Sequence, residues 1–161
     1  MKRCLVPIVF GALALSTACV EPCDALKDLP TGGLLGGSVS LAGPLQEDGR
    51  GTLMVTVFAE DPLANNDACC IHSLMYHDVD YSQPAERFIY EVAEIPERPE
   101  AYWVMAVFDD DGTFTDDFNF DDYAPMDGDL FSIHDGETPV IEISDDTPRE
   151  LDLELTHLWG S

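Results

Sequence analysis

A run of carboxylates after an apolar segment is the densest group of potential metal ligands in the chain. The run is Asp109-Asp110-Asp111-Gly112-Thr113-Phe114-Thr115-Asp116-Asp117, with Asp121, Asp122, Asp127 and Asp129 close behind. Calcium in proteins binds about six to eight hard oxygen ligands. The spacing is not that of an EF-hand, because the twelfth position counted from Asp109 is Phe120. We predict a calcium site at a strand end, anchored by Asp109 and Asp111 and completed by Thr113, Asp116 or Asp117. A solvated acidic loop is the alternative.

A second group of potential ligands combines cysteine, histidine and methionine over residues 69 to 78. Its sequence is Cys69-Cys70-Ile71-His72-Ser73-Leu74-Met75-Tyr76-His77-Asp78. These residue types bind copper or zinc. On a strand, however, Cys70 and His72 share a face that His77 does not, and no CxxC or HxxxH spacing occurs. We favour a disulfide cysteine with ordinary histidines, and keep a periplasmic copper or zinc protein as the alternative function.

Motifs for catalysis are missing from the sequence. It contains no GxSxG, HExxH or SxxK motif and no glycine-rich phosphate loop. Pairs of carboxylates occur by chance in so acidic a chain, so a hydrolase using scattered carboxylates is only a third hypothesis. Tyr102 and Trp103 suggest an aromatic platform for carbohydrate, but within an apolar strand we predict that they belong to the core. We do not expect an enzyme.

The charge of the chain restricts its partners. Without the first eighteen residues it keeps five basic and all 32 acidic residues, a formal charge of −27. Such a surface repels phosphate backbones, so we expect no nucleic-acid partner. It attracts cations or basic proteins, and it also resembles the surfaces of proteins from salt-adapted organisms. That habitat is an alternative explanation for the acidic loop.

Apolar residues after position 37 recur with the two-residue period of β-strands. Leu53, Val55 and Val57 share one face of a segment whose other face carries Met54 and Phe58. Other segments with this period lie near residues 38–41, 87–92, 102–108, 130–133, 140–143 and 151–156. Turn signals such as Asp111-Gly112 and Asp135-Gly136 separate them. We predict an all-β domain over residues 37–158, a single antiparallel β-sandwich of seven or eight short strands.

The order of these segments resembles the transthyretin-like or carboxypeptidase-regulatory-like sandwiches of exported bacterial proteins. The resemblance is carried by residues 37–43, 51–58 and 88–92, and by Ile95-Pro96 leading to the segment from Tyr102 to Gly112. The chain departs from that pattern at Glu97-Arg98-Pro99-Glu100, where such domains commonly have a Pro-Pro-Gly turn. The resemblance implies an Ig-like or transthyretin-like binding module and not an enzyme.

The N-terminus has the features of an export signal. Lys2 and Arg3 precede an apolar stretch that is shorter than the roughly 20 residues needed to span a bilayer. The segment Leu15-Ser16-Thr17-Ala18-Cys19 resembles the lipobox of bacterial lipoproteins, which implies that Cys19 carries a diacylglyceryl group and an amide-linked acyl chain such as palmitate. The domains are thus a signal peptide (1–18), a lipidated tether (19–36) and the sandwich (37–158). Val20 stands where inner-membrane lipoproteins of enteric bacteria carry aspartate, so we expect attachment to the outer membrane. The alternative is an ordinary secretory signal cut after Ala18.

Three cysteines remain once Cys4 leaves with the signal and Cys19 is lipidated. Cys23, Cys69 and Cys70 in an oxidising compartment allow one disulfide and leave one thiol over. A bridge from Cys23 to Cys69 or Cys70 would fasten the tether to the domain, whereas a bridge between the two adjacent cysteines is sterically less favourable.

The function predicted from the sequence is that of a lipid-anchored envelope module without catalytic activity, stabilised by calcium. Its expected partners are the membrane, through the lipid, and a cation or an envelope protein of unknown identity.

Overall fold

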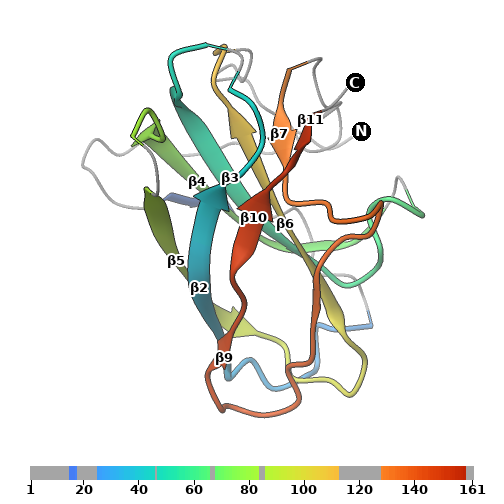
Figure 1. Ribbon diagram of the computed structural model, residues 1–161. Coiled ribbons are helices and arrows are strands. Elements are labelled where there is room, and N and C mark those ends of the chain that lie inside the picture. The colour runs from blue at the N-terminus through green and yellow to red at the C-terminus, as the bar shows by residue number, and fades with distance from the viewer. Residues whose placement is uncertain are drawn as a thin grey trace, which may run out of the picture.

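The computed structural model describes residues 15–17, 25–45, 47–65, 68–83, 86–112 and 128–158. Within these ranges the chain is all-β, with no helix and eleven strands in two sheets (Figure 1). No helix in the described ranges is long and apolar enough to cross a bilayer. The predicted all-β class is therefore confirmed.

The larger sheet has the strand order β1-β4-β3-β6-β7-β11, and β8 pairs separately with β6. Its strands are β1 (Leu15–Thr17), β3 (Arg50–Phe58), β4 (Cys70–Asp80), β6 (Tyr102–Asp109), β7 (Leu130–Phe131), β8 (Val140–Ile141) and β11 (His157–Leu158). Every pairing in this sheet is antiparallel, as predicted.

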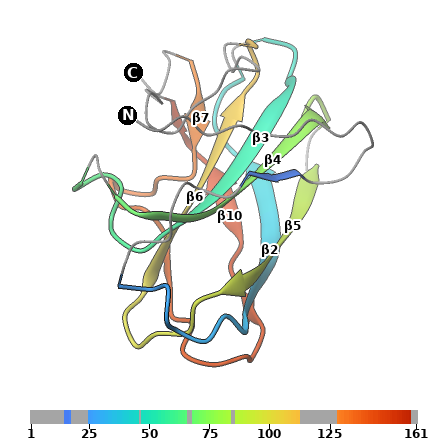
Figure 2. The ribbon, with the colours of Figure 1, turned by 180° about the vertical axis from the view of Figure 1, so that it is seen from behind.

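The smaller sheet has β2 at its centre. Its strands are β2 (Gly33–Leu41), β5 (Arg87–Ile95), β9 (Arg149–Glu150) and β10 (Leu153–Leu155). The pairing of β2 with β5 is antiparallel, but β9 and β10 pair with β2 in parallel. The prediction of an antiparallel sandwich is therefore wrong at this edge of the sheet. Parallel neighbours are joined by crossovers and not by tight turns, so the turn signals in the sequence do not indicate this pairing. Figures 1 and 2 show β2 and β10 on one side of β3 and β6.

Two apolar clusters lie on the two faces of the larger sheet. The inner core, between the sheets, combines residues such as Leu53, Val55, Val57 and Val104 with Leu35, Val39, Tyr90 and Val92 of the smaller sheet. The outer cluster consists of Met54, Phe58, Met105, Val107, Phe131 and Ile133. Consecutive residues of β3 alternate between the two clusters, which confirms that this strand is apolar on both faces.

Tyr102 and Trp103 follow the same alternation in β6. Tyr102 is completely buried in the inner core, and half-buried Trp103 packs against the outer cluster. The prediction that these aromatic residues belong to the core is therefore confirmed, most clearly for Tyr102.

The predicted turns have the backbone that their glycines allow. Gly49, Gly112, Gly128 and Gly136 have φ angles of 78°, 75°, 115° and 82°. A side chain at such angles is strained, so the Asp-Gly pairs mark the places where the chain reverses.

The glycine-rich start of β2 is part of the fold. β2 begins at Gly33, inside the predicted tether of residues 19–36, and Leu26 is buried in the inner core. A Cβ atom on Gly33 would lie 2.5 Å from Cγ2 of Ile143 and 2.7 Å from the carbonyl oxygen of Ile95. These glycines therefore permit close packing of strands, where we had expected a spacer.

Arg98 occupies the turn that departs from the Pro-Pro-Gly pattern. Its guanidinium donates to the carbonyl oxygens of Ala59, at 2.6 Å, and Ala101, and lies 4.2 Å from the ring centroid of Tyr102. One side chain thus supplies the donors and the ring contact that hold the β5–β6 connection against the end of β3.

Candidate functional site

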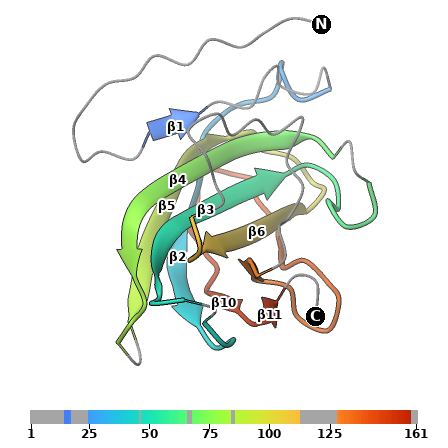
Figure 3. The same cartoon turned by 90° about the horizontal axis from the view of Figure 1, so that it is seen from above.

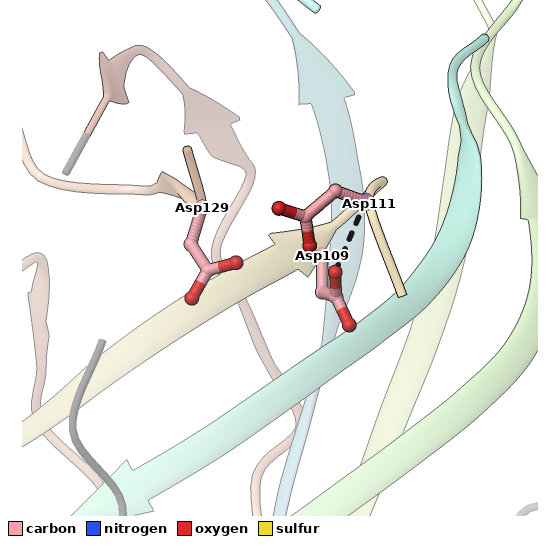
Figure 4. Close-up of side chains that lie close together, drawn as sticks. All are labelled: Asp109, Asp111 and Asp129. Atoms are coloured by element: carbon pink, nitrogen blue, oxygen red, sulfur yellow. Dashed lines mark hydrogen bonds between the residues drawn. The ribbon is translucent and has the colours of Figure 1, made fainter. Parts of the chain in front are cut away.

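Three aspartates converge where β6 ends and β7 begins. Asp109 is the last residue of β6, Asp111 lies in the turn after it, and Asp129 immediately precedes β7 (Figure 4). One carboxylate oxygen from each lies within 4.8 Å of the others. We call these residues the acidic triad. Asp109 and Asp129 are each 1% exposed, whereas Asp111 is exposed.

The register of the β6–β7 pair explains this convergence. Val107 lies opposite Phe131 and Phe108 opposite Leu130, so the same antiparallel register brings Asp129 towards Asp109. The turn then carries Asp111 back over the strand end. Oδ1 of Asp109 accepts hydrogen bonds from the backbone N–H groups of Asp111 (3.2 Å) and Gly112 (2.8 Å).

Gly51 allows a close backbone contact behind the triad. Thr52 of β3 pairs with Asp109, and a Cβ on Gly51 would collide with the Asp109 carbonyl oxygen. β3 therefore approaches the end of β6 more closely than a residue with a side chain would allow, and this fixes the backbone that carries Asp109.

Two of the predicted calcium ligands belong to the triad and one triad member was missed. Asp109 and Asp111 lie together as expected, whereas Thr113, Asp116 and Asp117 fall outside the described residues. The sequence analysis noted Asp129 near the loop but did not include it among the ligands. Pairing the segment near 130–133 with residues 102–108 would have identified it.

Asp110 belongs to a different environment. It is 6% exposed, and its Oδ2 accepts a hydrogen bond from the backbone N–H of Glu47 at 3.0 Å. Its carboxylate therefore fastens the loop before β3, and the triad is formed by its two sequence neighbours with Asp129.

The group at residues 69 to 78 is divided between the two faces of β4. Cys69 packs against the inner core and Cys70 against the outer cluster, and both are disulfide-bonded. Nε2 of His72 lies 3.4 Å from the carbonyl oxygen of Glu94, and Nδ1 of His77 lies 3.3 Å from Oγ1 of Thr52. Within the described residues, the acidic triad is the group whose potential ligand atoms come close together.

A polar cleft lies beside the start of β3. It has a volume of about 490 Å³ and is lined by Arg50, Gly51, Thr52, His77, Asp78 and Asp80. The guanidinium of Arg50 binds Oδ2 of Asp80 at 3.0 Å. Hydrogen bonds from the Ser82 side chain and backbone lower the pKa of Asp80, which favours its carboxylate form. A group held ionised in this way is a poor general acid.

No family model, curated protein or solved structure matches this chain.

Proposed function

We propose that this protein is a non-catalytic binding module of the cell envelope, exported and lipid-anchored through Cys19, whose acidic triad binds a calcium ion. The observation that carries the proposal is the convergence of three carboxylates at the β6–β7 edge, two of them nearly completely buried.

Burial makes this convergence costly without a cation. Carboxylates that share a poorly solvated site repel each other, so the site favours either a bound proton or a bound cation. Calcium accepts carboxylate and backbone oxygens in flexible geometries. The triad supplies three such groups on a turning backbone, which suits calcium better than a softer metal.

For the domain we propose an Ig-like or transthyretin-like sandwich. The two facing sheets support this assignment, as does the hydroxyl of Tyr102, which donates at 2.6 Å to the carbonyl oxygen of Pro96 six residues upstream. A tyrosine at a strand start that bonds backward in this way resembles the tyrosine corner of sandwich proteins.

The lipid anchor is supported by the N-terminal residues alone, since Cys19 lies outside the described residues. Cleavage after Ala18 would remove β1 (Leu15–Thr17) from the edge of the larger sheet, next to β4. Attachment to the outer membrane remains part of the proposal on the same grounds. Copper or zinc binding at residues 69 to 78 is less well supported, because disulfide-bonded cysteines do not supply thiolate ligands.

Thermal unfolding with added calcium tests the triad. We expect calcium to raise the melting temperature beyond sodium chloride at matched ionic strength, with a stabilisation of about 2.7 kcal/mol at a hundredfold excess over Kd. Asp109→Asn with Asp129→Asn should abolish the extra shift, because asparagine keeps an acceptor for the turn but removes the charges.

Two further variants control this experiment. Asp111→Asn changes only the exposed member of the triad and should weaken calcium binding without disturbing the core. Glu150→Gln with Glu154→Gln removes two exposed carboxylates elsewhere and should leave the calcium shift intact. If calcium and sodium chloride at matched ionic strength raised the melting temperature equally in the wild type and in every variant, the calcium site would be contradicted.

A further inference from the structure

The short strand β1 occupies one edge of the larger sheet. It pairs antiparallel with the middle of β4, where Leu15 lies opposite Met75 and Thr17 opposite Ser73. Figure 3 shows β1 beside β4, whose other edge pairs with β3. Because β1 lies within the predicted signal peptide, cleavage after Ala18 leaves this edge of β4 without its strand.

The part of β4 that pairs with β1 lacks the usual protection of an edge strand. Soluble proteins commonly protect such edges with charged residues, proline or bulges. The β3–β4 ladder is irregular near both of its ends, but it is regular from His72 to Tyr76, and β1 pairs within that stretch. Residues 70–76 contain no acidic residue, lysine, arginine or proline, although the chain has 32 acidic residues. Once β1 is removed, this stretch is therefore suited to accept another strand.

The surroundings of this stretch indicate which side chains a strand there needs. Met75 is half-buried against the outer cluster. Ser73 is 1% exposed, and its hydroxyl lies 3.3 Å from Oγ1 of Thr56. Residues directly opposite each other in an antiparallel pair share a face of the sheet. A strand on this edge therefore needs an apolar residue opposite Met75 and a small or hydroxyl-bearing residue opposite Ser73.

The charge around the edge favours a basic segment. A strand that runs as β1 does has its N-terminal end towards Asp78 and Asp80, and both of these side chains are exposed. Asp80 pairs with Arg50, whereas Asp78 lines the polar cleft beside it. The acidic surface attracts positive charge. Lysine or arginine at the N-terminal end of the incoming strand would therefore be favourable.

We propose that the edge of β4 that β1 leaves binds an extended segment of another envelope protein as an added antiparallel strand. The segment has an apolar residue opposite Met75, a small or hydroxyl-bearing residue opposite Ser73, and lysine or arginine near Asp78. Main-chain hydrogen bonds give such added strands their affinity, and alternate side chains give selectivity. The inference rests on the proposed export with cleavage after Ala18, which the lipoprotein signal and the ordinary secretory signal share.

A synthetic peptide tests the edge in the exported, cleaved protein. The probe is Lys-Lys-Ala-Leu-Ala-Leu-Ser-Thr-Ala, in which two lysines precede the sequence of residues 12–18. We expect the probe to slow amide hydrogen exchange across residues 70–76. Exchange in β5, an edge strand of the smaller sheet, should not change. A scrambled peptide of the same composition controls for attraction of lysine to the acidic surface, and it should protect neither strand.

Methylation of the probe backbone distinguishes strand addition from other modes of binding. In an antiparallel pair, the N–H groups of alternate residues point towards the neighbouring strand. A methyl group on the serine nitrogen and one on the threonine nitrogen should therefore have different effects. One should weaken binding by about tenfold or more, and the other should have little effect. Equal affinity of the two methylated probes would overturn the proposal.

Failure of this inference can be told apart from failure of the proposed export. Intact-mass spectrometry shows whether the exported protein still contains residues 1–18. Absence of probe binding at residues 70–76 of the cleaved protein would overturn the binding edge alone. Retention of residues 1–18 would overturn the anchor, and the partner strand with it, because β1 would keep its place. Dimerisation of the cleaved protein through residues 70–76 would overturn the proposed partner in favour of a second copy.

Discussion

Three buried tyrosine hydroxyls make the stability of this domain sensitive to alkaline pH. Tyr81 donates to the carbonyl oxygen of Val39 across the two sheets, at 2.9 Å, and Tyr90 donates to that of Leu151, at 2.6 Å. Tyr102 donates to Pro96 within the β5–β6 connection. Burial raises the pKa of Tyr102 to about 12 and raises the pKa values of Tyr81 and Tyr90 further above the usual value.

The direction and size of the pH effect follow from these shifts. In the unfolded chain a tyrosine loses its proton near pH 10, before the folded chain does. Stability is therefore complete below about pH 10 and decreases as the pH rises towards the folded pKa. Each tyrosine costs about 1.4 kcal/mol per pH unit in that window, so three cost about 4 kcal/mol per unit. By about pH 11.5 the loss is about 6 kcal/mol, comparable with the whole stability of many domains.

Urea unfolding followed by circular dichroism, from about pH 8 to about pH 11.5, measures this slope. Tyr81→Phe should reduce it by about one third, and should cost about 1–3 kcal/mol at neutral pH because the Val39 carbonyl loses its buried donor. Phe108→Leu is the matched control, since Phe108 contacts the Tyr81 ring edge-on at 5.0 Å but does not titrate. That variant should lower stability at every pH and leave the slope unchanged. An unchanged slope in Tyr81→Phe would refute the reasoning.

Three further predictions concern the N-terminus, the β5–β6 turn and the backbone beside the triad. Intact-mass spectrometry should find lipid on the wild-type protein and none on Cys19→Ser; release of both with the same unlipidated mass would contradict the anchor. Arg98→Met should lower the free energy of unfolding by about 2–4 kcal/mol, because the Ala59 carbonyl loses a charged donor, and Arg98→Lys should restore only part of it. Gly51→Ala should cost about 1–3 kcal/mol in urea unfolding, because its Cβ would displace the Asp109 carbonyl; no change would show that β3 can shift freely.

The strands that carry apolar residues on both faces were predictable from local sequence. In β3 and β6 the alternation alone assigned residues such as Val55 and Val104 to one face and Met54 and Met105 to the other. The Asp-Gly turns were predictable from local sequence in the same way, since such a turn requires only the positive φ angle of its glycine. These features depend on neighbours within a few residues, and a single sequence contains that information.

The features that were missed depend on contacts between distant segments. Leu153 of β10 lies beside Val39 in a parallel pair, although more than a hundred residues separate them in the chain. The glycines of β2 resembled a flexible linker because the side chain of Ile143 that excludes a Cβ there lies far along the sequence. Asp129 joins Asp109 only once the register of β7 on β6 is known.

Burial separates the two explanations that the sequence offered for the acidic loop. Adaptation to a saline habitat places carboxylates on the surface, where solvent ions screen them. That explanation suits Glu150, Glu154 and the other exposed acids. It does not account for Asp109 and Asp129, which are 1% exposed at the end of a closely packed strand. Salt in bulk solution screens buried charges poorly, whereas an ion bound between them neutralises them directly. The proposed calcium ion, bound with Asp111, would act on this buried pair in that direct way.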